Sequence, residues 1–375
     1  MLKILILMPN QNIISIIIIG GETMRSSYFV KAIMCIIIAA GFGSCRGVAN
    51  KPKIIGVMKP EQESIKLIYQ NRTRGNGIQL GFSGEEVSLN NPKLLAENEE
   101  ELEYKLQKIE KPEDYVLPEG VSEANFFEVT PTKQMGIGEV LLLSGSASDK
   151  TNESLDFQVS FTTVNSKPAR LKITELRPVY GSKKSEFIEF IVEEGGNLFG
   201  IKLSNVGAKG DEQHHYTFPS AEVKKGERVV FHWRSIEEGN KDEVDATIIS
   251  KGSQACENAR DFWGNIQKVP VRNPNVITVK NPSDNTIQDA VLYFNIRPKE
   301  KEKQKPEFKW TFPEIETAAK EAVAAGVWKM KGEAFCEEDF FCCNITPSAS
   351  IGRSNDTGEW KVYTAKEVTM GEKNN

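Results

Sequence analysis

The chain has 375 residues, of which 39 % are hydrophobic and 26 % charged, and its formal net charge is −5. This length suits two domains, because single hydrophobic cores stop growing beyond roughly 250 residues. The apolar content excludes a largely disordered chain. The acidic balance, with lysines interleaved among glutamates, offers no basic footprint for a phosphate backbone. We therefore expect two folded domains and no nucleic-acid partner.

The N-terminal part of the sequence has the pattern of an export signal. Met24 is followed by an arginine and a lysine, then by an apolar run, and then by small residues that end at Cys45. This order is typical of a secretory signal, and the apolar run is shorter than the roughly 20 residues that a membrane-spanning helix needs. Residues 1–23 do not fit the pattern, because Pro-Asn-Gln-Asn interrupts their apolar residues. We expect translation to start at Met24.

The end of this signal resembles the lipobox of bacterial lipoproteins, in the looser form found in spirochaetes. Phe-Gly-Ser precedes Cys45 at the point where the chain turns polar. The resemblance implies that residues 24–44 are removed as a signal peptide and that Cys45 becomes the acylated first residue of the mature protein. Each CH₂ group of an acyl chain that is buried in the membrane contributes about 0.8 kcal/mol of binding free energy, so several chains would anchor the protein stably. The alternatives are a plain cleaved signal and a single-pass anchor.

A tether over residues 45–58 precedes a first β-rich domain over residues 59–166. Residues 65–70 and 78–82 flank Arg-Gly-Asn-Gly, whose glycines and asparagine suit the positive φ angles of a hairpin loop. Further short alternating segments follow between turn residues, which favours an antiparallel sandwich. The acidic run at residues 96–103 is interpreted as a solvated edge or loop, although such a run can also bind cations or basic proteins.

A second β-rich pattern begins after a linker that contains Pro168. Its order of short motifs resembles the lamin-tail domain, an immunoglobulin-like sandwich found in nuclear lamins and in many bacterial secreted and membrane-anchored proteins. The resemblance covers roughly residues 170–375, with an insertion at residues 300–347, and it implies no universal ligand because a sandwich hosts many functions. The motifs that carry it are Ile-Thr-Glu-Leu (173–176), Leu-Phe-Gly-Ile-Lys-Leu (198–203), Tyr-Thr-Phe-Pro (216–219), Asn-Thr-Ile-Gln-Asp-Ala-Val (285–291) and the closing segment 349–374.

The predicted fold is therefore all-β, with two immunoglobulin-like β-sandwich domains, the second lamin-tail-like with a short helical insertion. In the insertion, Phe308, Trp310 and Phe312 lie on one face if the segment is extended, so they form either an exposed ligand surface or a core-facing strand. The next residues predict a helix, with Pro313 in the first turn, alanines in the interior and Gly326 near the end.

Four cysteines follow the leader and Cys45. In an exported protein an even number indicates disulfides, and four cysteines allow three pairings. Adjacent Cys342 and Cys343 are strained as a pair, so bridges to Cys256 and Cys336 are the expected arrangement. A cysteine metal site is the alternative, but the spacing lacks a Cys-x-x-Cys knuckle and no histidine lies near. We predict no metal and no cofactor.

The histidines and the motif search assign no catalytic residue. His214 and His215 would point to opposite faces of a strand. In a loop they can share a metal ion with Asp211 or Glu212, but a solvated loop is the favoured interpretation. His232 is interpreted as structural. The sequence has no Gly-x-Ser-x-Gly, His-Glu-x-x-His or Walker motif, so we predict that the protein is not an enzyme.

Together these features predict a lipid-anchored bacterial protein of the cell envelope, at an outer-membrane, periplasmic or surface-exposed face. Its expected role is non-catalytic, as a binding or scaffold module whose loops or sheet edge contact protein or glycan. Two alternatives remain open. One is a metal-dependent hydrolase or its accessory domain, because lamin-tail domains often accompany nucleases and phosphatases, and the other is a purely structural envelope protein.

Overall fold

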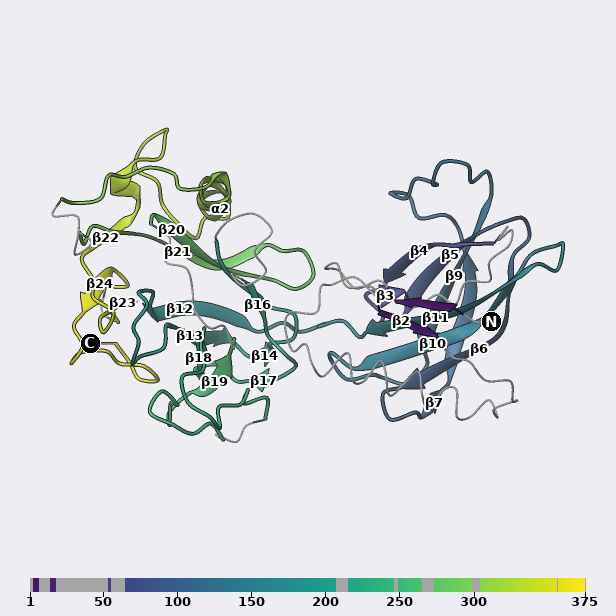
Figure 1. The fold of residues 1–375 in the computed structure, drawn as a ribbon, viewed down its shortest axis with the longest axis horizontal. Coiled ribbons are helices and arrows are strands. Elements are labelled where there is room, and N and C mark those ends of the chain that lie inside the picture. Colours follow the sequence, from purple (N-terminus) through teal and green to yellow (C-terminus); the bar gives the residue numbers. More distant parts are fainter. Residues whose placement is uncertain are drawn as a thin grey trace. The chain divides into compact units, whose positions relative to one another are not determined.

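The chain folds into two separate units, of which the first ends at Ser166 and the second begins at Lys167 (Figure 1). This computed structural model describes residues 65–206, 215–245, 249–264, 273–298, 304–355 and 357–374, and the short strands at 3–6, 14–17 and 53–54. Both units consist mainly of β-strands arranged in sheets, so the predicted all-β, two-domain fold is confirmed. The expected start at Met24, the signal peptide at 24–44 and Cys45 lie outside the described residues.

Unit 1 is a sandwich of two antiparallel sheets. One sheet has the strand order β3-β11-β10-β6-β7 and the other has the order β4-β5-β9-β8, and β1 (Lys3–Ile6) pairs separately with β2 (Ile14–Ile17). The strands of the two sheets are β3 (Lys53–Ile54), β4 (Leu67–Arg72), β5 (Ile78–Ser83), β6 (Ser88–Ala96), β7 (Glu101–Leu102), β8 (Tyr104–Ile109), β9 (Ala124–Pro131), β10 (Val140–Ser148) and β11 (Ser154–Thr162).

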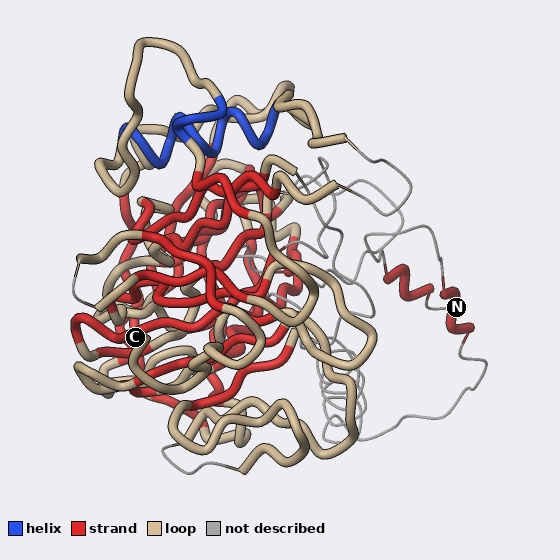
Figure 2. Tube along the Cα trace, turned by 90° about the vertical axis from the view of Figure 1, so that its left-hand side faces the viewer, coloured by secondary structure: helices blue, strands red, loops and turns tan. Residues whose placement is uncertain are grey.

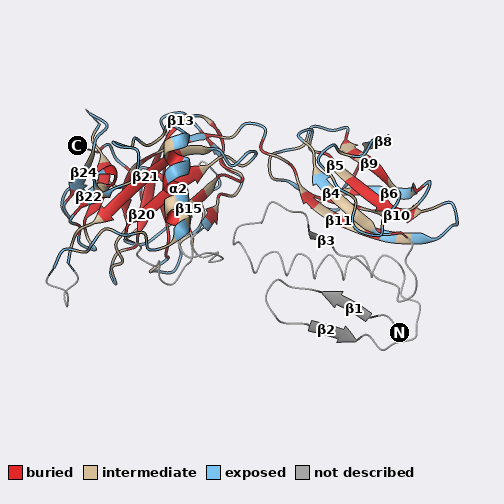
Figure 3. Cartoon of the chain, turned by 90° about the horizontal axis from the view of Figure 1, so that it is seen from above, coloured by how far each residue is buried: buried red, intermediate tan, exposed pale blue. Residues whose placement is uncertain are grey.

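Alternation along the strands separates the core of unit 1 from its outer faces. Ile78, Leu80 and Phe82 of β5 are fully buried against Leu141 and Leu143 of β10, and the residues between them point the other way. Figure 3 shows the buried residues gathered in strands such as β10, β20 and β21. The position of each residue along a strand therefore decides whether it faces the core or the opposite side of the sheet.

Unit 2 is a larger sandwich. A six-stranded sheet has the order β19-β18-β13-β12-β23-β24, a five-stranded sheet has the order β16-β15-β20-β21-β22, and β14 pairs with β17. The strands are β12 (Arg170–Arg177), β13 (Phe187–Glu194), β14 (Gly196–Asn197), β15 (Lys202–Asn205), β16 (His215–Thr217), β17 (Glu222–Val223), β18 (Arg228–His232), β19 (Arg260–Trp263), β20 (Asn275–Lys280), β21 (Ile287–Asn295), β22 (Phe341–Cys343), β23 (Ser350–Arg353) and β24 (Trp360–Tyr363).

Aromatic side chains fill the space between the two sheets of unit 2. The ring of Phe218 contacts those of Phe190 and Phe262 edge-on, with centroids 6.1 and 5.2 Å apart. Edge-to-face pairs of this kind contribute about 0.5–1.5 kcal/mol beyond the area that they bury. This core joins the inner faces of both sheets and leaves their outer faces to be covered by other segments.

One helix of the described residues, α2 (Pro313–Ala324), covers the outer face of the five-stranded sheet (Figure 2). Ile315 and Ala319 are fully buried there against Leu292 and Phe294 of β21. Pro313 occupies the first turn, as the sequence predicts, because the missing N–H of proline has no helical partner at that position. The helix thus converts an apolar sheet face into a second, smaller core.

Candidate functional site

Unit 2 buries charged groups on the outer face of its six-stranded sheet. Glu175 of β12 and Glu189 of β13 are direct cross-strand neighbours, and both are fully buried. Glu189 is paired with Arg228 and accepts a hydrogen bond from the Thr174 hydroxyl at 2.6 Å. Burial raises the pKa of Glu189 to about 7 although Arg228 pulls it down. The two carboxylates are therefore perturbed in the way that catalytic groups often are.

The C-terminal segment from Thr369 to Asn374, here called the C-terminal clasp, closes over these carboxylates. Thr369 donates to Glu175 from its backbone N–H at 3.2 Å and from its hydroxyl at 2.8 Å, and the Gly371 N–H donates to Glu189. The Asn374 amide donates to two backbone carbonyls of the sheet at 2.9 and 2.8 Å. The carboxylates thus bind the protein's own chain, which leaves them no free face for a substrate.

His232 belongs to the same covered layer. Its Nε2 lies 2.8 Å from Asp261 Oδ1, and its ring stacks on Trp263 with centroids 3.9 Å apart. The other oxygen of Asp261 accepts the backbone N–H of Cys256 at 2.7 Å. Burial lowers the pKa of His232, which favours the neutral ring. Because both His232 and Asp261 are fully buried, the pair fastens β19 and the loop before it to β18.

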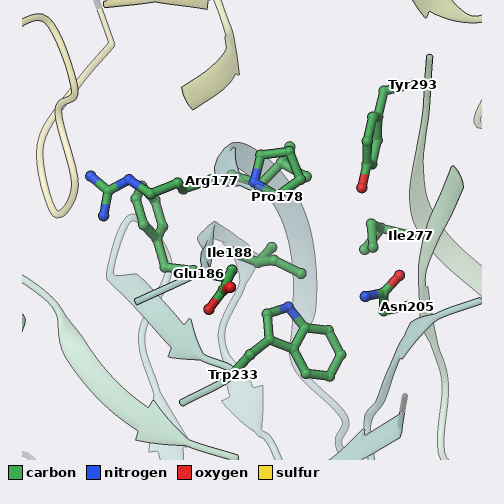
Figure 4. A pocket seen from close by; sticks show the side chains of 10 residues that line it. Arg177, Pro178, Glu186, Ile188, Asn205, Trp233, Ile277 and Tyr293 are labelled. Carbon is green, nitrogen blue, oxygen red and sulfur yellow. The ribbon is translucent and has the colours of Figure 1, made fainter. Parts of the chain in front are cut away.

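A small cavity lies between the two sheets of unit 2. Figure 4 shows Glu186 and Trp233 on one side and Asn205 and Tyr293 on the other. Arg234 donates to Glu186 Oε2 at 2.5 Å, and Glu186 Oε1 is buried with no hydrogen-bond partner among the described residues. The volume of about 10 Å³ has room for roughly one water molecule. This cavity is too small for an organic ligand.

The four cysteines beyond the leader are free thiols, so none of the predicted disulfides is formed in this structure. Cys256 is buried beside the C-terminal clasp on the outer side of the six-stranded sheet, whereas Cys343 is buried in the core between the sheets. Because the sheet separates these two layers, Cys256 and Cys343 cannot meet. Cys336 and Cys342 are exposed around the short turn of η2 (Glu337–Asp339).

The aromatic triplet of the insertion packs inward without forming a strand. Phe308, Trp310 and Phe312 are half-buried against the small core under α2. The ring of Phe308 contacts those of Phe294 and Phe340, with centroids 5.4 and 5.2 Å apart. The triplet therefore serves packing here, because a ring that faces the core cannot also offer that face to a ligand.

The predicted histidine loop is only partly described. His214, Asp211 and Glu212 lie outside the described residues, and exposed His215 has its Nδ1 2.9 Å from the hydroxyl of Ser204. Within the part of the chain that the structure describes, no three histidine, cysteine or carboxylate side chains gather as metal ligands.

Unit 1 has an outer sheet face of a different kind. In its four-stranded sheet the residues between core positions point outward, and the register aligns them in rows across β4, β5, β9 and β8. One row holds two aromatic side chains, and the next holds four polar side chains and is here called the polar row. The first row is Tyr69, Gly81, Phe126 and Ile109, and the polar row is Asn71, Gln79, Glu128 and Gln107.

A pair of tyrosines stands beside the polar row. Tyr69 and Tyr115 lie over buried Phe126, with ring centroids 5.8 and 5.9 Å from it and 4.7 Å from each other. Gly81 permits this arrangement, because a Cβ there would come within 2.5 Å of the Phe126 ring and 2.8 Å of Tyr69 Cβ. Tyr115 comes from the loop after β8, and its hydroxyl donates to the carbonyl of Ile68 at 2.6 Å. Both tyrosines are half-buried, and the Tyr69 hydroxyl donates a long hydrogen bond of 3.5 Å to Gln79 Oε1.

The polar row is accessible and partly ordered. Asn71 and Gln107 are exposed at its two ends, and Gln79 and Glu128 are half-buried in its middle. Gln79 Nε2 donates to Glu128 Oε2 at 2.9 Å, and the Thr130 hydroxyl donates to Glu128 Oε1 at 3.2 Å. Neighbouring strands are about 4.8 Å apart, so the row spans roughly 14 Å. We take this face, with its donors, acceptors, one carboxylate and two aromatic rings, as the candidate site.

Sequence reasoning found the hairpin of this site but not the site itself. The alternation within residues 78–82 already places Gln79 opposite to the apolar residues. Tyr69 shares the parity of core-facing Leu67 and reaches the outer face only because the strand register shifts between them, which alternation does not predict. Their partners on β8 and β9 depend on strand pairing between distant parts of the chain, which alternation does not reveal.

Comparisons with known proteins link the chain to two others and to one family. A family model described as "TP_1001 protein second domain" matches residues 169–372. An uncharacterized protein of Treponema pallidum (strain Nichols) is 38 % identical to this chain over 354 residues. The alignment covers 88 % of this chain and 88 % of the treponemal protein. A solved structure of a DUF4876 family protein from Bacteroides thetaiotaomicron VPI-5482 has 11 % identity, a TM-score of 0.23, and coverage of 74 % of this chain and 89 % of its own. The similarity to the treponemal protein is longer than either unit and so spans both.

Proposed function

This chain belongs to the family of the TP_1001 protein second domain, and we propose that it is a lipid-anchored envelope protein that acts as a non-catalytic binding module for protein or glycan. The observation that carries this proposal is the accessible polar row of unit 1 beside the tyrosine pair. Such a face combines hydrogen-bonding side chains with rigid aromatic rings, which is the combination that recognition surfaces use.

A binding role suits the charges of this site better than a hydrolytic role. Glycoside hydrolysis requires two carboxyl groups that flank the scissile bond, and Glu128 is the only carboxylate of the polar row. The perturbed carboxylates of unit 2, Glu175 and Glu189, are occupied by the C-terminal clasp. The ionisable groups described above therefore support the structure, while the polar row remains accessible for a ligand.

The lipid anchor rests on the sequence. The order of basic, apolar and small residues before Cys45 supports acylation of that cysteine at the start of the mature chain. None of the helices in the described residues is long and apolar enough to cross a membrane. We also propose that residues 170–375 form a lamin-tail domain, because the order of their short motifs resembles that family.

The binding part of the proposal is tested with the chain from Arg46 onward. Three envelope fractions are used, namely the insoluble glycan meshwork, detergent-solubilised membrane proteins and lipid vesicles. We expect retention of the protein on the glycan or the protein fraction, and loss of retention in the double variant Gln79→Ala with Glu128→Ala. The matched control is Asp156→Ala with Gln158→Ala, an acid and an amide on the outer face of the other sheet of unit 1. Retention that is equal in all three proteins contradicts the proposal, as does the absence of any retention.

The anchor is tested separately. Metabolic labelling of the full chain with a palmitate analogue is expected to mark the wild type and not Cys45→Ala. Equal labelling of both proteins rules out the lipobox without affecting the binding site.

A further inference from the structure

We infer that the polar row and the tyrosine pair bind a neutral oligosaccharide of about three or four pyranose units, an inference that rests on the proposed binding function. The planes of the two tyrosine rings are inclined at 57°, so one ring would stack on a sugar ring while the other contacts its edge. The amides and the carboxylate of the polar row would bond to the hydroxyl groups of the sugar chain.

The tyrosine pair provides a preformed stacking surface. One face of a pyranose ring carries C–H groups, which pack favourably on an aromatic ring. Tyr69 is held over Gly81 and Phe126, and Tyr115 is fixed by its hydrogen bond to Ile68. Because both rings are already ordered, little side-chain entropy is lost when a sugar binds.

The polar row has free hydrogen-bonding capacity that matches a line of hydroxyl groups. A carboxylate accepts about four hydrogen bonds, and Glu128 receives two, from Gln79 and Thr130. Gln79 has a second N–H, and Asn71 and Gln107 each bring an amide donor and acceptor at the exposed ends. Hydroxyl groups both donate and accept, so a sugar chain satisfies this mixed set where a purely anionic or cationic ligand does not.

The charge and length of the row define the ligand further. Glu128 is the only charged side chain of the row, so an acidic glycan would meet a like charge at its centre. The span of roughly 14 Å across four strands suits a short oligosaccharide. A protein partner would require a larger apolar centre than two half-buried tyrosines supply.

The experiment is a calorimetric titration of the chain from Arg46 onward with chitotetraose, cellotetraose and maltotetraose, and with a tetragalacturonate as the acidic probe. We expect at least one neutral tetrasaccharide to bind and the acidic probe to bind at least about tenfold more weakly. Tyr115→Ala and Gln79→Ala should each weaken binding of the neutral sugar by about tenfold. Tyr115 lies in a loop and Gln79 on the surface of a strand, so both variants retain the core, and Asp156→Ala with Gln158→Ala should bind as the wild type does.

The outcomes separate this inference from the proposed function. Failure of all neutral sugars to bind, with retention on the membrane-protein fraction that still depends on Gln79 and Glu128, overturns the oligosaccharide and leaves the binding module in place. Preference for the acidic probe overturns the stated ligand class. Sugar binding that Tyr115→Ala and Gln79→Ala do not change overturns the assigned site, and loss of both sugar and fraction binding in the wild type overturns both proposals.

Discussion

Units 1 and 2 share the sandwich architecture but use the outer faces of their sheets in opposite ways. Unit 2 covers its outer faces with the C-terminal clasp and α2, and the charged groups beneath are paired with each other or with the backbone. Unit 1 leaves the polar row of its four-stranded sheet accessible. Perturbed, buried carboxylates therefore belong to the structural part of this protein, whereas the candidate site consists of ordinary surface groups. The physical reason is that a covered charge must find an internal partner, whereas an accessible polar group can exchange water for a ligand.

The largest expected effect comes from the covered face. Glu189→Ala leaves Arg228 without its partner and removes the hydrogen bond that Glu189 accepts from the Gly371 N–H of the clasp. It should therefore lower the free energy of unfolding of unit 2 by about 3–5 kcal/mol. All five tryptophans lie in unit 2, so urea unfolding followed by tryptophan fluorescence reports on this unit. An unchanged midpoint would show that the pair is not needed.

The same carboxylate predicts a pH dependence. Glu189 has a pKa of about 7 in the folded protein and an ordinary value of 4.5, so the folded state holds its proton more tightly than the unfolded state. Its contribution to the free energy of unfolding should therefore fall as the pH rises from 4.5 to 7, by at most about 3 kcal/mol, and stay constant above that. Glu189→Gln removes this titration, so its unfolding curves should show a flatter pH dependence than those of the wild type. Identical slopes in both proteins would refute the assignment.

A smaller effect is expected at the clasp itself. Gly371 has a φ of 84°, and a Cβ there would come within 2.0 Å of Cys256 Sγ, so Gly371→Ala should destabilise unit 2 by about 1–3 kcal/mol and loosen the clasp. Burial raises the pKa of Cys256 to about 11 and that of Cys343 to about 12, so native alkylation should modify exposed Cys336 and Cys342 first. In Gly371→Ala, alkylation of Cys256 should become faster while that of Cys343 stays slow. Mass spectrometry of the alkylated protein measures all four sites, and equal protection of Cys256 in both proteins would argue against the clasp.

The smallest effect on stability is expected at the candidate site. Gln79→Ala with Glu128→Ala removes the hydrogen bond between these two side chains, the long bonds that they accept from Tyr69 and Thr130, and no core contact. Because water can replace these partners at the surface, the free energy of unfolding of unit 1 should change by less than about 1 kcal/mol. Hydrogen exchange of the β5 and β9 amides measures this change. A large loss of protection would mean that the row is structural, like the buried groups of unit 2, and would remove the contrast between the units.

Local patterns in the sequence were sufficient for the elements with short-range causes. The hairpin of β4 and β5 follows from Asn76, whose φ of 63° asparagine tolerates, together with the alternation on either side. Helix α2 follows from Pro313 at its start and from Gly326, which has a φ of 72°, just beyond its end. These predictions succeeded because the deciding interactions lie within a few residues of each other.

Only the tertiary structure decided which side chains meet. The even number of cysteines after Cys45 predicted disulfide bridges to Cys256. The fold instead places Cys256 and Cys343 in different layers of unit 2. The alternating rings of Phe308, Trp310 and Phe312 left two interpretations open, and the presence of α2 above β21 turned them toward a small core. The polar row joins Asn71 to Glu128 through the register of three strands. By itself the sequence determined the strand alternation, the helix ends and the leader pattern, because these depend on residue type and spacing. Pairing across long loops is set by the whole core, so the covered carboxylates and the accessible row became visible only in the folded chain.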